Sequence, residues 1–189
     1  MLSIIGIQSG ALMSEFMKGS TGRFMGAQAK ARGLSGDVKN RELKALLCGL
    51  DPKSGNALVT NAGNRHKAGW DCTFTAPMSV SVAWGVADPK ARIKIETAHT
   101  AGVRAGIALL ERYAFFTNHG QGRNKDLKNA EGGVVAVAFR HSTNRVGESS
   151  LHDHVLVANF SVDGRVLHFD TRNVSKANAA YAAEILAVQ

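Results

Sequence analysis

The sequence predicts an α+β fold: a mainly antiparallel central sheet flanked by helices, in a single domain over residues 1–189. At least four stretches are rich in β-branched and aromatic residues. Two blocks carry helical periodicity. Short loops join several of the strands, which favours antiparallel pairing. With 44% hydrophobic residues, a chain of 189 residues is long enough to bury one core.

The first fifty residues begin with a predicted strand over residues 1–9. A short helix is expected over 11–20. The glycine-rich basic segment over 19–36 is expected to be mobile, apart from a helical turn or two. Leucines at i, i+3, i+4 and i+7 predict an amphipathic helix over 37–50, with Asp37 as its N-cap.

Residues 51–69 are predicted to form a loop with a brief strand over 57–60. The stretch 69–76, GWDCTFTA, alternates and is rich in aromatic and β-favouring residues, so it is predicted to be a strand. Pro77 is expected to end this strand.

Two helices are predicted next. Ser79 is placed to cap a helix over 79–87. One long helix is expected over 88–117, with Asp88 as N-cap and Pro89 at the first helical position.

The last third of the chain alternates between turns and strands. A polar turn over 118–133 precedes strands over 133–143, 151–162 and 164–173. The final stretch, NAAYAAEILAVQ, is an Ala-rich helical pattern without a stop signal. We therefore expect the chain to be an N-terminal fragment of a longer domain or protein.

The chain is basic, with a formal net charge of +8 and a pI near 9.8. This charge suits a polyanionic partner, nucleic acid first and an anionic membrane surface second, while a basic protein that binds no polyanion stays open. Cys48 and Cys72 predict neither a disulfide framework nor a zinc–thiolate site. No membrane span or secretory signal is evident, so we expect a cytoplasmic protein.

Three of the seven histidines gather in HSTNRVGESSLHDH. His152 and His154 are two residues apart in a predicted strand, so their side chains share a face. His141 ends the preceding strand and would lie beside them if the two strands pair antiparallel. Three such imidazoles would form an open site for a divalent metal, and zinc, nickel, copper or manganese suits them better than magnesium. A histidine pair on a solvated strand face is the alternative.

The other four histidines show no comparable arrangement: His66, His99, His119 and His168. His99 is expected to be a partly exposed structural residue of the long helix.

Residues 69–84, GWDCTFTAPMSVSVAW, and the later segment FRHSTNRVGESSLHDHVLVAN resemble the relaxase domain of the TrwC/TraI (MobF) conjugation proteins, in the HUH endonuclease superfamily. The matching patterns are D-x-T-F-x-A-P-x-S-V-S, then F-R-H-x-T-x-R followed by L-H-x-H. The start MLSI and the segments GLSGDVKNRELKALLCG and HFDTRNVSKANAAYAAEIL also fit. The resemblance covers essentially the whole chain and stops before the C-terminal part of the family's domain.

The resemblance implies a function in plasmid conjugation. His141, His152 and His154 would bind a divalent metal (Mg²⁺, Mn²⁺ or Zn²⁺), and Asp71 would orient one imidazole and help deprotonate the nucleophile. Relaxases of this family nick one DNA strand at the origin of transfer, where a tyrosine attacks the scissile phosphate and leaves a 5′-phosphotyrosine. Single-stranded origin DNA and other relaxosome and coupling proteins are the implied partners.

The nucleophile is where the chain departs from the family. At the two tyrosine positions it has Phe16 and Phe24, and a ring without a hydroxyl cannot attack phosphorus. Tyr113 and Tyr181 fall in predicted helices and are not expected to replace it. A smaller departure is Met78, where the family pattern often carries lysine.

Three explanations of the phenylalanines stay open: deliberate substitution to trap a DNA complex, a natural homologue that binds without cutting, and cutting by metal-activated water. Correspondingly, the candidate functions are a relaxase domain in a form lacking its tyrosine, a catalytically inactive DNA-binding homologue, and a histidine–metal hydrolase of small phosphoesters. The positive charge counts against the last. Clustered cations are predicted to follow the DNA backbone; they are Arg23, Lys30, Arg32, Arg65, Lys67, Arg140 and Arg145.

Overall fold

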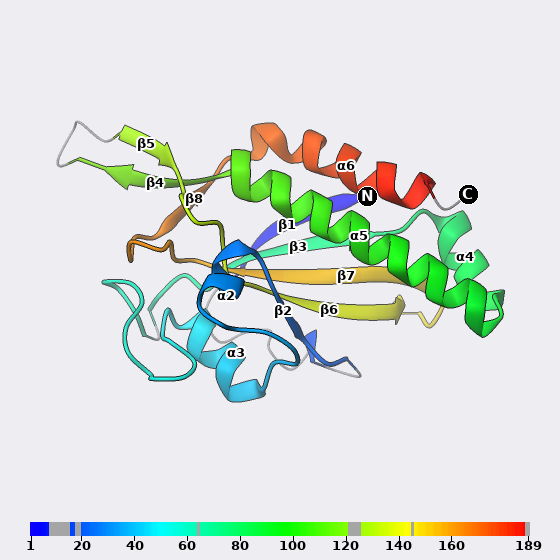
Figure 1. The fold of residues 1–189 in the computed structure, drawn as a ribbon, viewed down its shortest axis with the longest axis horizontal. Coiled ribbons are helices and arrows are strands. Elements are labelled where there is room, and N and C mark those ends of the chain that lie inside the picture. Colours follow the sequence, from blue (N-terminus) through cyan, green and yellow to red (C-terminus); the bar gives the residue numbers. More distant parts are fainter. Residues whose placement is uncertain (8–15, 18–19, 64, 121–125, 145, 188–189) are drawn as a thin grey trace.

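The computed structural model describes residues 1–7, 16–17, 20–63, 65–120, 126–144 and 146–187. Its centre is a five-stranded antiparallel sheet with the strand order β1-β3-β7-β6-β2 (Figure 1). The strands of this sheet are β1 (Leu2–Ile7), β2 (Arg23–Met25), β3 (Gly69–Thr75), β6 (Ala136–Thr143) and β7 (Ser149–Ala158). The predicted α+β class with a mainly antiparallel central sheet is confirmed.

A second, smaller antiparallel sheet has the order β5-β4-β8 and extends from one end of the molecule (Figure 1). Its strands are β4 (Phe115–His119), β5 (Asp126–Asn129) and β8 (Leu167–Phe169). The helices are α2 (Ala27–Ala31), α3 (Asn40–Leu47), α4 (Met78–Val86), α5 (Pro89–Tyr113) and α6 (Val174–Leu186), with a 3₁₀ turn over Thr171–Asn173. In the described residues, no helix is both long and apolar enough to cross a membrane.

The central sheet separates two hydrophobic clusters. α5 and α6 lie side by side over one face, whereas α3 lies beyond the other (Figure 1). Strand alternation explains the division, because successive side chains point to opposite faces. On β7, for example, Val155 and Val157 pack toward α5 and α6, while Leu156 and Ala158 pack toward α3. We call these the α5 face and the α3 face.

Two of the three predicted helix caps are wrong. Asp88 does cap α5, since its carboxylate accepts a hydrogen bond from the backbone N–H of Ala91 at 2.8 Å. By contrast, α3 is capped at Lys39, whose backbone N–H donates to Glu42 at 2.8 Å, and not at Asp37. Likewise α4 begins directly after Pro77, so Ser79 lies inside the helix.

Other differences arise where tertiary pairing outweighs local pattern. The long helix ends at Tyr113, because the following aromatic residues pair as β4 and bury Phe115. β5 forms within the predicted polar turn, and β2 within the segment expected to be mobile. The strand expected over 57–60 is wrong: only an isolated bridge is found there. The helix expected over 11–20 lies mostly outside the described residues.

Candidate active site

The three histidines meet on the α3 face of the sheet. β6 and β7 pair antiparallel, as predicted, and His141 lies directly opposite His152. The ring centroids of His141 and His152 are 5.4 Å apart, and His154 lies 5.5 Å from the first and 5.2 Å from the second. The β6–β7 hairpin therefore gathers three imidazoles that are up to thirteen positions apart in the sequence.

Neighbouring groups fix how two of these rings are turned. Nδ1 of His154 donates to Oδ2 of Asp71 at 2.7 Å and also lies 3.1 Å from the Thr73 hydroxyl. Nδ1 of His152 donates to the carbonyl oxygen of Ser150 at 2.9 Å. A histidine that donates through Nδ1 presents an unprotonated Nε2, which is the metal-binding form.

The third ring has an unsatisfied atom. Nε2 of His141 is buried and has no hydrogen-bond partner among the residues that the structure describes. Buried polar atoms without partners are rare, and an ion is one of the groups that satisfies them. All three histidines thus have an Nε2 atom to offer one ligand.

Burial also favours the metal-binding protonation state. Desolvation lowers the pKa of His141, and the nearby imidazoles lower it further, although a hydrogen bond with the Phe16 backbone opposes the shift. Burial also lowers the pKa of His152, although the hydrogen bond to the Ser150 backbone opposes this shift. Both rings are therefore neutral at pH 7, the form that coordinates a cation.

The donor set and tautomers fit a divalent metal. Within the described ranges, no three His, Cys, Asp or Glu side chains stand in a finished metal-binding arrangement.

Phe16 and Phe24, the two residues expected at the tyrosine positions, are separated in space. The ring of Phe16 is buried and packs edge-on against His154, with ring centroids 5.1 Å apart. Phe24 lies opposite Val137, so it is on the same face but four residues along β6 from His141. At about 3.3 Å per residue, that is roughly 13 Å. Among the two phenylalanines, Phe16 is the one that contacts the histidine cluster.

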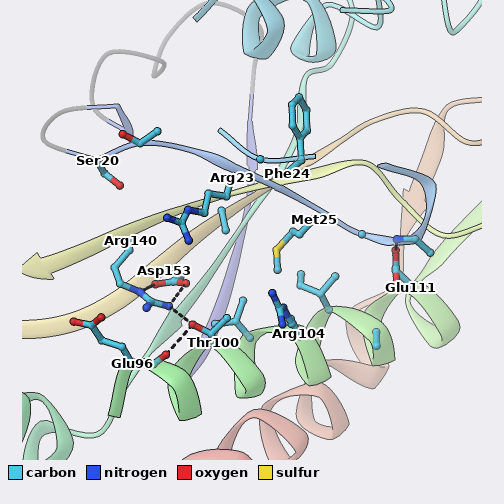
Figure 2. Close-up of a pocket in the computed structure, with 18 residues that line it drawn as sticks. Ser20, Arg23, Phe24, Met25, Glu96, Thr100, Arg104, Glu111, Arg140 and Asp153 are labelled. Carbon is cyan, nitrogen blue, oxygen red and sulfur yellow. Dashed lines mark hydrogen bonds and ion pairs between the residues drawn. The ribbon is translucent and has the colours of Figure 1, made fainter. Parts of the chain in front are cut away.

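The predicted DNA-binding cations do not form one surface. Arg23 and Arg140 point to the α5 face, where they line a cavity of about 850 Å³ that also contains Arg104 (Figure 2). The guanidinium of Arg140 is occupied by the carboxylate of Asp153, which does not fit the phosphate contact expected of it. Lys30, Arg65 and Lys67 are exposed, Arg32 is half-buried, and Arg145 lies outside the described residues.

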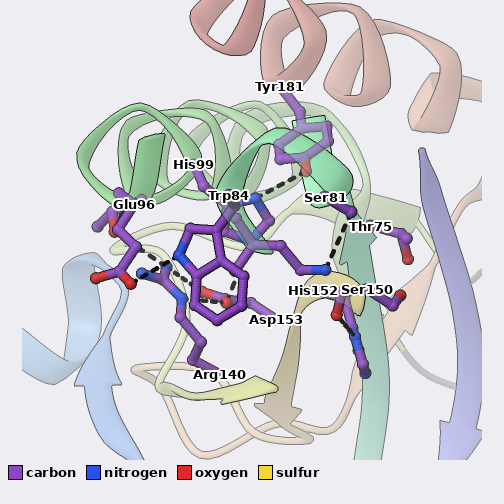
Figure 3. Close-up of polar contacts among 12 residues, drawn as sticks. Thr75, Ser81, Trp84, Glu96, His99, Arg140, Ser150, His152, Asp153 and Tyr181 are labelled. Atoms are coloured by element: carbon purple, nitrogen blue, oxygen red, sulfur yellow. Dashed lines mark hydrogen bonds and ion pairs between the residues drawn. The ribbon is translucent and has the colours of Figure 1, made fainter. Parts of the chain in front are cut away.

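Sequence reasoning missed a buried polar network behind the histidines (Figure 3). Asp153 lies between the two histidines of β7, so it points to the α5 face, where it is bound by Arg140 and His99. His99 is fully buried, so its expected partial exposure is wrong. The signal was present in the sequence, because an acidic residue between two histidines of a strand must face the opposite side. Tyr181 contacts His99 on this side, away from the metal candidates.

The charge of Asp153 should stabilise the fold near neutral pH and make the free energy of unfolding fall in acid. Burial raises its pKa, but hydrogen bonds and charges from His99 and Arg140 outweigh this and bring the pKa from 3.8 to about 2. Since the folded pKa is depressed, the stabilisation is present above pH 4 and is lost as the pH falls toward 2. We expect the stability gap between the parent chain and Asp153→Asn, measured by urea unfolding, to narrow by about 2 kcal/mol from pH 5 to pH 2. A gap that stays constant would contradict this linkage.

Comparison with known proteins places this geometry in a family. The family model described as TrwC relaxase matches residues 14–188. The chain belongs to the TrwC relaxase family. A curated relative, the multifunctional conjugation protein TraI of Escherichia coli strain K12, is 32% identical over 146 residues, which make up 76% of this chain and 8% of TraI. The chain thus spans under a tenth of the length of this curated relative.

Solved TrwC structures share the fold over the whole chain. TrwC complexed with a 27-mer DNA comprising the recognition hairpin and the cleavage site superposes with a TM-score of 0.82 and 26% identity, covering 100% of this chain and 68% of that one. The metal-bound structure of TrwC with oriT DNA gives a TM-score of 0.81 and 26% identity, covering 100% and 69%. A copper-bound TrwC complex is a further match. Metal-bound TrwC structures support a divalent metal in the TrwC relaxase family.

Proposed function

We propose that this relaxase-family chain binds single-stranded DNA of a plasmid origin of transfer on its α3 face and holds the scissile phosphate at the histidine cluster. The observation that carries the proposal is the cluster itself: three imidazoles whose Nε2 atoms are left for one cation, with Phe16 against them. The solved TrwC complexes with oriT DNA support the choice of ligand.

His141, His152 and His154 are the proposed metal ligands. When bound, a divalent metal would polarise the phosphate oxygens and stabilise the charge that develops on them during transfer. Asp71 holds His154 in the tautomer that exposes Nε2, and burial keeps the other two rings neutral. Nitrogen donors favour manganese or zinc over magnesium, and the copper-bound TrwC complex agrees with an imidazole site.

Phe16 occupies the proposed position of the attacking group. In a tyrosine-bearing form, a hydroxyl on this ring would give up its proton, with Asp71 as the proposed acceptor, and attack the scissile phosphate. A bond from the tyrosine oxygen to phosphorus would form while the 3′-oxygen leaves. The chain as written lacks that hydroxyl, which supports a second candidate: an inactive homologue that binds origin DNA without forming the covalent adduct. Hydrolysis of small phosphoesters has no supporting observation.

Three exposed or half-buried cations are proposed to contact the DNA backbone: Lys30, Arg32 and Arg65. Lys67 is left out, because its ammonium lies over the ring of Trp70, which belongs to the core on the α5 face. Arg32 lies over the ring of Phe160, and α2, which carries Lys30, packs on the α3 face through Ala29. Relaxosome and coupling proteins are the proposed macromolecular partners, and the bacterial cytoplasm the proposed compartment.

DNA binding can be tested without cleavage. We expect a fluorescein-labelled single-stranded oligothymidylate to bind with an affinity that falls linearly on a log–log plot against salt, with a slope of about −0.7 for each phosphate contact. Lys30→Gln should remove about one phosphate contact and so make the slope shallower by about 0.7. Fluorescence anisotropy across a salt series measures both quantities.

Lys90→Gln is the matched control, because Lys90 is an exposed cation on α5, which covers the opposite face of the sheet. If both substitutions change the slope equally, the DNA does not lie on the α3 face. If the parent chain shows no binding that depends on salt, the proposed function is wrong.

A further inference from the structure

Each proposed metal ligand is a chain neighbour of a residue in the buried network on the α5 face. Arg140 precedes His141, and Asp153 separates His152 from His154. Arg140 and Asp153 are themselves directly paired across β6 and β7, one residue pair before His141 and His152. Two consecutive residue pairs of one hairpin therefore carry a charged pair on one face and two imidazoles on the other.

The charged pair is held tightly. Nε of Arg140 donates to Oδ1 of Asp153 at 2.8 Å, and Nη2 donates to Oδ2 at 2.9 Å. A second contact from Nη2 reaches the Thr100 hydroxyl at 3.0 Å. Such a two-point contact between planar groups has one geometry, unlike contacts between flexible apolar side chains.

Helix α5 contacts Asp153 directly through His99, and helix α6 contacts His99 through Tyr181. Nε2 of His99 lies 3.2 Å from Oδ1 of Asp153, and Nδ1 of His99 lies 3.0 Å from the Tyr181 hydroxyl (Figure 3). The approach of α6 depends on Gly102, since a Cβ there would lie 2.8 Å from the carbonyl oxygen of Tyr181. The network thus joins both helices to the strand that carries two of the proposed ligands.

The β6–β7 pairing is regular up to the histidines and irregular just beyond them. The register shifts between His141 and Thr143. A slip of one residue would turn every side chain of the strand to the opposite face. The pair Arg140–Asp153 directly precedes the pair His141–His152. The position of His141 opposite His152 decides whether the imidazoles converge.

We propose that Arg140 and Asp153 are positioning residues of the metal site, whose ion pair on the α5 face fixes the β6–β7 register so that His141, His152 and His154 converge on the other face. This inference rests on the proposed metal function of those histidines. It gives a reason for a buried ion pair at this position, because buried ion pairs add little stability over an apolar pair, whereas fixing register is their best-attested use.

The test measures metal binding instead of DNA cleavage. Mn²⁺ affinity is measured by calorimetry and Co²⁺ coordination by visible absorption, for the parent chain, Asp153→Asn, Arg140→Lys and the apolar double variant Arg140→Met/Asp153→Leu. We expect each variant to bind Mn²⁺ about 10–100-fold more weakly, the range seen when groups that orient metal ligands are removed. The Co²⁺ spectrum should also change, because the imidazoles no longer meet in the same geometry.

Leu110→Ala is the control for general destabilisation, since Leu110 is fully buried on α5 and belongs to the same core. If it weakens Mn²⁺ binding as much as Asp153→Asn does, the pair acts only through stability and the inference is overturned. Unchanged Mn²⁺ affinity and Co²⁺ spectra in the folded variants would also overturn it. A parent chain that binds neither ion, or a His152→Ala variant that binds both as the parent does, would instead contradict the proposed metal site.

Discussion

Phe16→Tyr is expected to restore covalent chemistry. With Mn²⁺ and a labelled single-stranded oligonucleotide from the origin of transfer, this variant should form a DNA–protein adduct that survives denaturing electrophoresis. The reason is geometric: the substitution adds one hydroxyl to a ring that lies 5.1 Å from that of His154. Cleavage should exceed that of the parent chain by on the order of 10³-fold or more, since loss of a nucleophile typically costs that much or more.

Phe24→Tyr is the paired variant for the same assay. It adds the same hydroxyl to the same kind of ring. This ring is on β2, opposite Val137, which lies four residues along β6 from His141. We expect no adduct from it alone. An adduct from Phe24→Tyr and none from Phe16→Tyr would reverse the assignment of the two positions. Binding without an adduct from either single variant or from the double variant would favour the inactive homologue.

Replacing both histidines of β7 should abolish metal uptake. We expect His152→Ala/His154→Ala to lose more than about a hundredfold in Mn²⁺ affinity by calorimetry, because removing groups that merely orient a ligand already costs about 10–100-fold. Asp71→Asn should have a smaller effect within that range, since it weakens the contact that fixes the His154 tautomer.

His168→Ala controls for non-specific metal binding by histidines, because His168 is exposed on β8, in the smaller sheet. Its affinity for Mn²⁺ should equal that of the parent chain. Retention of Mn²⁺ binding by the β7 double variant would rule out the three-histidine site, whatever the DNA affinity proves to be.

The convergence of the histidines could be predicted from the sequence because it depends on period-2 alternation and a short hairpin. His152 and His154 had to share a face, and the five-residue connection 144–148 between β6 and β7 brings His141 beside them. That Asp71 orients one of the imidazoles could be predicted only through the family motif. The structure shows that this imidazole is His154, which is 83 positions away and meets Asp71 across β3 and β7.

Features that depend on long-range packing escaped prediction. Arg140 flanks His141 in the sequence, which suggested a DNA contact, yet alternation turns it to the other face. His99 is predicted to be partly exposed because the pattern of α5 does not show which side will meet Asp153. Neither could the sequence distinguish Phe16 from Phe24, because their distances from the histidines depend on how two separate segments pack on the sheet.

The proposed attacking position and the proposed metal donors belong to different parts of the molecule. Phe16 comes from a segment outside the central sheet, whereas the three histidines belong to two of its inner strands. In the proposed arrangement, the loss of one oxygen atom removes the covalent step while the folding core and the three histidines stay as they are. Under this proposal, a form that binds the origin of transfer without cutting it differs from a cutting form by one codon at position 16.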